Sequence, residues 1–319
     1  MQNEGKISKP ERQYLNSSDL INELWELSTQ IMGNPVKIKI LPQKNVLTTV
    51  DVTMDKNVCI SGPVAFTPEH AAVIDSCYTI LKSGYKSFPE QLIAKVMSGN
   101  FEPSVSQEKL EHVHQLVSEL RHMDVTIDCT DEFRERGFIS KKEKMKFKNY
   151  MLPLLEVEMK TANGVIVRGY KFIAAPPLCA YAETIHKIID VPFSLLSTCK
   201  KVSDTKEAII IKRYLIQKIE RAKEENHKDR ILCCQILYES SDRTKSQDKG
   251  MYYSLGYKEE SYSNWRKKRS RLNAIVKQVL ESFREQGYIS EFQEFKNGQK
   301  IVGVQITIKR VEEKTVAYQ

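Results

Sequence analysis

The chain has 319 residues, which is long enough for two domains. Of these, 41% are hydrophobic and 28% are charged, a composition that excludes a disordered or fibrous protein. Its net charge of +8 is unevenly distributed: residues 1–204 carry 25 basic and 25 acidic side chains, and residues 205–319 carry 24 and 16. We therefore expect the second part to bind a polyanion.

Cysteine usage and the N-terminus indicate the compartment. The seven cysteines are an odd number without the spacing of zinc ligands, which predicts buried free thiols in a reducing environment. The first residues, Met-Gln-Asn-Glu-Gly-Lys, lack the apolar region of a signal peptide. No apolar run approaches the roughly 18–20 residues that cross a bilayer. The sequence thus predicts a soluble cytoplasmic protein without a membrane partner.

Residues 1–44 are predicted to form a helical N-terminal extension. Within 19–31, Leu20, Ile21, Leu24 and Leu27 recur at helical spacing. The sequence leaves open whether this helix docks on the protein or forms a dimer contact. Partial alternation over residues 46–60 predicts a strand.

The first globular unit, residues 45–200, is predicted to hold three helices, a strand over 125–128, a charged insertion over 130–150 and a hairpin. The hairpin strands, 154–160 and 165–173, flank Asn163-Gly164, a strong turn signal. The predicted helices begin at an N-cap and proline (Thr67-Pro68), at Ser87, and at the capping box of Ser104 and Gln107; the first two end at Gly84 and Gly99. The exposed face of the third helix is mixed in charge, so this unit is expected to dimerise or to contact DNA weakly.

The second unit, residues 201–319, repeats that order. Helices are predicted over 206–224 and 229–239, the latter containing Cys233-Cys234, and a polar loop covers 240–260. A basic amphipathic helix follows, and two strands, 288–296 and 299–309, flank Asn297-Gly298. The fold class expected is α+β, with two winged helix-turn-helix domains in tandem.

The basic helix carries the main functional signal. Five of the six residues from Arg266 to Arg271 are basic. An apolar stripe predicts one buried face: Leu272, Ile275, Val276, Val279, Leu280 and Phe283. The opposite face carries Lys267, Ser270, Arg271, Ala274 and Lys277. The small and hydrogen-bonding residues Ser270, Asn273 and Ala274 continue this outer face and are able to approach base edges.

In a helix-turn-helix the start of the second helix enters the major groove, where Arg or Lys pairs with guanine. Lys268 and Arg269 lie nearer the apolar side and are expected to contact phosphates. Lys296 and Lys300, near the hairpin tip, are expected to meet the DNA backbone. The alternative is a solvated, charged helix end. The predicted DNA-binding set here is Arg266, Lys267, Lys268, Arg269, Ser270, Arg271, Ala274, Lys277, Lys296 and Lys300.

A second lysine-rich stretch covers residues 141–148. From Lys144 onward lysines alternate with other residues, as on a strand with one wet face, so Lys144, Lys146 and Lys148 share a side. Two interpretations carry equal weight: the lysines contact phosphates without sequence preference, or they protect an exposed sheet edge from pairing with other chains.

No motif indicates an enzyme. The chain lacks a Gly-rich phosphate loop, a His-Glu-x-x-His zinc motif and a nucleophile motif. We expect no catalytic residues, no metal and no cofactor.

The layout resembles the plasmid replication initiator (Rep) proteins of bacteria. In the second unit the resemblance lies in IKRYLIQKI (211–219), YSNWRKKRSRLNAIVKQVLESF (262–283) and GYISEFQEFKNGQKIVGVQITI (287–308). In the first unit, AAVIDSCYTILKSGYKSF (71–88) and VTIDCTDE (125–132) are similar in layout to initiators of Gram-positive plasmids and integrative elements. The resemblance implies a double-stranded-DNA-binding initiator that recognises repeated origin sites, opens or marks the origin and recruits host replication proteins. Such initiators have no catalytic site of their own and often switch between a homodimer and a monomer. It places recognition on the helix face over 266–277 and the wing on Lys296 and Lys300.

Two alternatives remain open at this stage. A transcriptional regulator would use the same helix, and the sequence does not separate it from an initiator. A DNA-nicking enzyme of a mobile element would need clustered carboxylates or a tyrosine beside histidine ligands, and no such pattern is visible.

Overall fold

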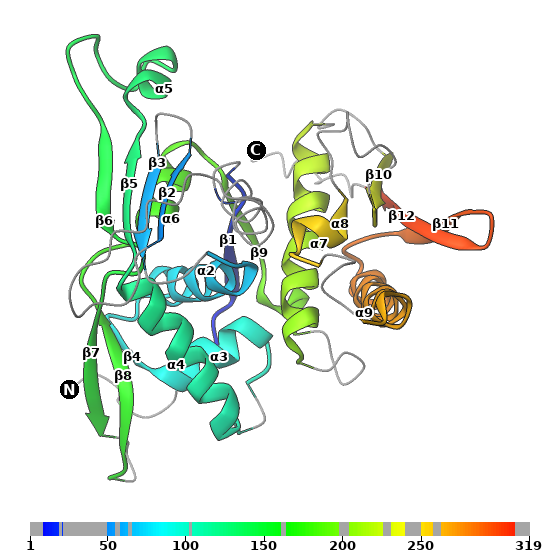
Figure 1. Cartoon of the computed structure of the whole chain (residues 1–319), viewed down its shortest axis with the longest axis horizontal. Coiled ribbons are helices and arrows are strands. Elements are labelled where there is room, and N and C mark those ends of the chain that lie inside the picture. Colours follow the sequence, from blue (N-terminus) through cyan, green and yellow to red (C-terminus); the bar gives the residue numbers. More distant parts are fainter. Residues whose placement is uncertain are drawn as a thin grey trace, which may run out of the picture. The chain divides into compact units, whose positions relative to one another are not determined.

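The computed structural model describes residues 9–18, 21, 50–54, 58–62, 66–101, 104–160, 164–197, 204–225, 231–239, 250–257 and 263–309. The chain divides into two compact units, Met1–Ser197 and Thr198–Gln319. Both units combine helices with small antiparallel sheets, so the fold class is α+β. Figure 1 shows the elements of each unit.

Three helices form the centre of unit 1: α2 (Pro68–Lys82), α3 (Glu90–Ser98) and α4 (Gln107–Arg121). Their buried stripes are largely apolar, as helical spacing predicted. Gly99 ends α3 in the left-handed conformation with φ +74°, as expected for a helix C-terminus. A Cβ at this position would lie 2.3 Å from the backbone carbon of Leu196, so glycine also permits a close approach of the chain.

Of the three helix starts predicted from the sequence of unit 1, one is confirmed. The Thr67 side chain caps α2, and His70 completes a capping box there. The predicted cap at Ser87 is wrong, because Ser87–Pro89 forms the short strand β4 and Pro89 occupies the cap position of α3. The predicted start at Ser104 is also wrong, since Ser106 caps α4 and accepts from Lys109 N.

The described part of unit 1 has three sheets, one of them the pair β1-β9. A four-stranded sheet has the order β2-β3-β5-β6, and a three-stranded sheet has the order β4-β8-β7. Figure 1 shows β5 and β6 extending away from α2–α4, with a short helix at the far end. The predicted hairpin is present as β7–β8. The remaining elements are β2 (Val50–Met54), β3 (Val58–Gly62), β5 (Asp124–Asp128), α5 (Thr130–Glu135), β6 (Lys146–Tyr150), β7 (Leu154–Lys160), β8 (Ile166–Phe172), α6 (Pro177–Thr184) and the 3₁₀ turn η2 (Phe193–Leu195).

The N-terminal prediction needs correction. β1 (Arg12–Asn16) pairs antiparallel with β9 (Ile188–Pro192), so these residues are part of unit 1 and not of a helical extension. Asn16 fixes the strand further, since its backbone N–H donates to Asp75 and its side chain donates to the Leu178 carbonyl. The helix predicted for 19–31 lies outside the described residues except for residue 21.

Unit 2 contains α7 (Lys206–Glu225), β10 (Ile231–Leu237), α8 (Met251–Ser254), α9 (Trp265–Glu285), β11 (Glu291–Asn297) and β12 (Lys300–Lys309). The basic helix and the following hairpin are present as predicted. β10 replaces the helix predicted over 229–239, because alternate residues Leu232, Cys234 and Ile236 are buried, which is a strand period. Cys233 is consequently exposed, whereas Cys234 is buried as expected.

The two units share an order of helices and strands that was predicted only in part from the sequence. In unit 1 it is helix α2, strand β4, helices α3 and α4, then hairpin β7–β8; in unit 2 it is α7, β10, α8, α9, then β11–β12. In both units the early strand pairs with the second strand of the hairpin, giving the sheets β4-β8-β7 and β10-β12-β11. The segment β5-α5-β6 is inserted between α4 and β7 of unit 1.

Candidate nucleic-acid interface

α9 has one buried and one exposed face. The six apolar residues of the predicted stripe are all buried, and the helix packs on α7. The predicted outer face is exposed at each of its positions: Lys267, Ser270, Arg271, Ala274 and Lys277. Because burial of the stripe fixes the rotation of α9, the outer face has a defined direction.

The start of α9 is capped but electrostatically unusual. The Asn264 side chain accepts from Lys267 N at 3.0 Å. The first turn contains no acidic residue. Since the N-terminus of a helix carries partial positive charge, basic side chains there are intrinsically unfavourable.

Glu207 of α7 compensates part of this charge. It accepts from Lys268 Nζ at 2.9 Å and lies 3.6 Å from Arg271. Burial would raise the pKa of the Glu207 carboxyl, but Lys268 and Arg271 outweigh it and the pKa is lowered. Lys268 also lies over the Tyr257 ring, 4.8 Å from its centroid. Lys268 is therefore engaged inside unit 2.

Glu239, which follows β10, binds two more of the predicted residues. It contacts Lys300 Nζ at 2.5 Å and Arg269 NH1 at 3.4 Å. Burial again opposes ionisation, yet Lys300 and Arg269 lower the pKa of the Glu239 carboxyl. One carboxylate thus joins α9 to the hairpin.

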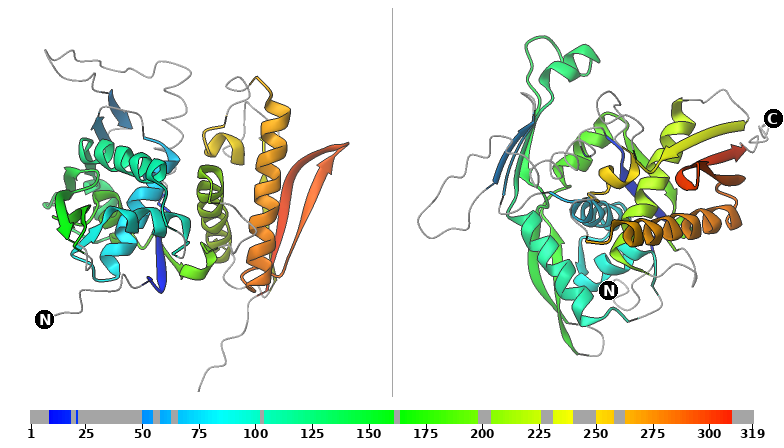
Figure 2. Two further views of the ribbon diagram at one scale, coloured as in Figure 1. Left: turned by 90° about the horizontal axis from the view of Figure 1, so that it is seen from below. Right: turned by 45° about the vertical axis from the view of Figure 1, so that its right-hand side comes forward.

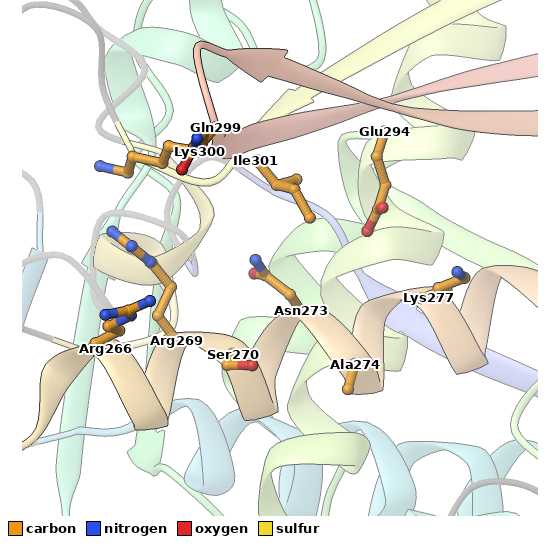
Figure 3. Close-up of a pocket in the computed structure, with 10 residues that line it drawn as sticks. All are labelled: Arg266, Arg269, Ser270, Asn273, Ala274, Lys277, Glu294, Gln299, Lys300 and Ile301. Carbon is orange, nitrogen blue, oxygen red and sulfur yellow. The ribbon is translucent and has the colours of Figure 1, made fainter.

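Between α9 and the hairpin lies a groove of about 530 Å³. Figure 3 shows Arg266, Arg269 and Lys300 near one end and Lys277 toward the other. Both views of Figure 2 show α9 beside the hairpin β11–β12. The complete lining is Arg266, Arg269, Ser270, Asn273, Ala274, Lys277, Glu294, Gln299, Lys300 and Ile301.

Four predicted cations have no carboxylate within 4 Å in the described part of the chain: Arg266, Lys267, Lys277 and Lys296. All four are exposed. Their charge is available to a partner, in contrast to the charge of Lys268 and Arg269.

The second lysine stretch lies on an edge strand. Among the described strands β6 is the last of its sheet, and Lys146 and Lys148 are exposed. Lys144 precedes the strand and is exposed too. Lys146 Nζ lies 2.7 Å from Asp128 Oδ2 on the neighbouring strand β5, so part of this charge is neutralised locally.

Several groove residues were missed from sequence. Asn273 is not among them, because the sequence placed it with Ser270 and Ala274 on the outer face of the helix; it is half-buried and lines the groove. Glu294, Gln299 and Ile301 line the groove from the hairpin. Only the alternation of the hairpin strands could have indicated them.

In the described helices, none combines the length and apolar character needed to span a bilayer. The described His, Cys, Asp and Glu residues form no group of three that could hold a metal ion.

Comparisons with known proteins give weak matches only. No family model and no curated protein matches the chain. Two crystal structures of domains 2 and 3 of RctB align with TM-scores of 0.40 and 0.39 at 10% identity. They cover 88% and 86% of this chain, and 98% and 95% of theirs. At these scores we base no conclusion on the likeness. The similarity to initiators of Gram-positive plasmids gains no support from these comparisons.

Proposed function

We propose that the chain binds double-stranded DNA and that unit 2 is a winged helix-turn-helix domain. In this proposal the outer face of α9 enters the major groove and the hairpin β11–β12, as the wing, follows the backbone. The order α7-β10-α8-α9-β11-β12 and the sheet β10-β12-β11 support this assignment.

The observation that carries the proposal is the uncompensated charge on one side of α9. Arg266, Lys267 and Lys277 are exposed and have no carboxylate within 4 Å in the described part of the chain, and Arg266 and Lys277 line the groove. The positive end of the helix adds to their field. A chain of phosphates is the partner that neutralises such an array along its length.

We further propose that the protein is a replication initiator of a plasmid or mobile element. The same element order in both units supports a tandem winged-helix organisation, which the initiator resemblance implies. Unit 1 then serves dimerisation or weaker DNA contacts. Recruitment of host replication proteins and the absence of a catalytic step belong to this proposal. Metal-dependent nicking of supercoiled DNA by the purified protein would contradict its non-enzymatic part.

Selection of bound duplexes from random DNA, using the full chain, tests the proposal. We expect one enriched motif, and affinity falling by roughly three decades between 50 and 200 mM salt if about six phosphates are contacted. Repeats of the motif beside a replication origin support initiation, whereas a single palindrome over a promoter indicates regulation. Binding that stays undetectable in dilute buffer would refute DNA binding.

A further inference from the structure

We propose that Asn273 selects against adenine at one position of the DNA site, because its side chain presents only hydrogen-bond donors to the groove. The favoured bases are those whose major-groove edge offers acceptors without a donor, guanine and thymine. This inference rests on the proposed function and assigns a specificity role within the same groove.

The amide of Asn273 is oriented by Tyr252 of α8. The phenol hydroxyl donates a hydrogen bond to Oδ1 of Asn273. Tyr252 is only 2% exposed, and burial raises the pKa of its hydroxyl, which therefore keeps its proton. A buried hydroxyl proton needs an acceptor, and among the described residues Oδ1 of Asn273 supplies it. In the opposite amide orientation Nδ2 would donate to the hydroxyl oxygen, and the buried hydroxyl proton would lose this acceptor.

Tyr252 itself is held firmly. Its backbone N–H donates to the Tyr238 carbonyl at 3.0 Å. Its ring packs against Tyr238, with centroids 5.6 Å apart, and against Trp265 at 5.4 Å in an edge-to-face arrangement. Because the ring cannot shift freely, the hydroxyl occupies a fixed position and fixes the Asn273 amide in turn.

The position of Asn273 allows contact with a base. It lines the groove, and Figure 3 shows its amide pointing from α9 toward the hairpin. The same figure shows the Glu294 side chain pointing from the hairpin toward α9, between Asn273 and Lys277. A carboxylate repels phosphate, so the middle of the groove suits base edges better than the backbone. Phosphates fit the cationic end near Arg266.

Base-edge chemistry then gives the preference. An unconstrained asparagine reads adenine with two bonds, accepting from N6 and donating to N7. Because Oδ1 faces Tyr252, the amide turns its Nδ2 hydrogens toward the groove, so the adenine N6 donor would meet another donor there and be desolvated without a partner. Guanine offers N7 and O6, and thymine offers O4, as acceptors for the Nδ2 hydrogens. One such mismatch typically changes affinity by about tenfold or more.

The test is selection from random duplex DNA with the full chain, for wild type, Asn273→Ala and Tyr252→Phe. Tyr238→Phe is the matched control, since it removes a hydroxyl from the same aromatic cluster without touching Asn273. Thermal unfolding of each variant monitors the fold. We expect Asn273→Ala to abolish a base preference of about tenfold at one position and to leave the rest of the motif unchanged. Tyr252→Phe should admit adenine at that same position.

Because adenine always pairs with the favoured thymine, adenine at the selected position is also replaced by 7-deazaadenine, which lacks the N7 acceptor, to assign the base that is read. Two results would overturn the inference while sparing DNA binding: loss of wild-type affinity on 7-deazaadenine at the position where Asn273→Ala acts, or an Asn273→Ala motif unchanged at every position. If Tyr252→Phe does not fold, the Asn273→Ala comparison still decides. If the wild-type protein selects no sequence, the proposed function itself fails and the inference falls with it.

Discussion

The Lys300 ammonium of β12 lies 2.5 Å from the Glu239 carboxylate that follows β10, so the hairpin is tied to the body of unit 2 beside its tip. Because the same carboxylate contacts Arg269 of α9 at 3.4 Å, it joins both walls of the groove. Glu239 therefore sets the spacing of the two elements that the proposal assigns to DNA.

We expect Glu239→Gln to strengthen non-specific DNA binding and to relax sequence preference. The substitution removes a negative charge beside the groove and releases Lys300 and Arg269 toward phosphates, so the salt slope should steepen by about one to two units. Gel shifts on random and selected duplexes across salt measure both effects. Glu158→Gln on β7, which changes the net charge equally outside unit 2, is the control. Weaker binding of the Glu239 variant to random duplex would contradict the role.

Lys267 and Lys268 are neighbours, but we expect substitution of Lys267 to affect DNA binding and substitution of Lys268 to affect stability. Lys267→Ala removes an unpaired cation, so the salt slope should fall by about one unit with little change in stability. Lys268→Ala leaves Glu207 without its closest partner and should lower the free energy of unfolding by about 1–2 kcal/mol.

Gel shifts across salt and urea unfolding of both variants separate these effects, with Lys171→Ala of β8 as a control for the loss of one exposed charge. Loss of DNA binding in the Lys268 variant at unchanged stability would assign Lys268 to DNA instead.

Asp128 reports on whether Lys146 is engaged within the sheet. The hydrogen bond from Lys146, followed by that from Thr130, lowers the pKa of Asp128 from 3.8 to about 2. We expect Lys146→Met to raise this pKa toward 3.8, and Lys148→Met to leave it unchanged. Since the folded pKa is the lower one, any stabilisation by the pair is present above pH 3.8 and is lost as the pH falls toward 2. A carboxyl-carbon NMR titration measures the pKa of Asp128 directly. If this pKa is the same in the Lys146 variant as in the wild-type protein, the ion pair does not form.

The position of β6 at a sheet edge favours the protective role of its lysines. We expect Lys148→Thr to cause concentration-dependent association, because the unpaired edge loses a charge that repels other strands. Sedimentation over a concentration series measures association, and gel shifts should give an unchanged salt slope. If the salt slope of DNA binding is instead lower by about one unit in the Lys148 variant and the variant does not associate, Lys148 contacts phosphate.

What the sequence predicted correctly depends on local signals. Hairpins around Asn163-Gly164 and Asn297-Gly298, and the two faces of α9, follow from turn chemistry and helical period over a few residues. β10 was missed because its short alternating run forms a strand only by pairing with β12, far along the chain. The pairing of β1 with β9 is equally non-local. The partners of the site, Glu207, Glu239 and Tyr252, lie on other elements, so a helical wheel of α9 could not reveal them.

Gly303 of β12 is the position where the hairpin is least tolerant of a side chain. A Cβ there would lie 2.5 Å from the Ile236 carbonyl oxygen and 2.5 Å from the Phe295 ring. Gly303→Ala must therefore displace Phe295 or loosen the pairing of β12 with β10, at a cost of about 1–3 kcal/mol.

Because the register already shifts between Phe295 and Lys296, the displacement should move the hairpin tip and weaken DNA binding as well. Gln305→Ala, two residues along the same strand and partly exposed, is the control. Unfolding by urea and gel shifts on both variants measure the two effects. Equal stability of the Gly303 and Gln305 variants would mean that the strand accommodates a methyl group without cost, and that the groove does not depend on this contact.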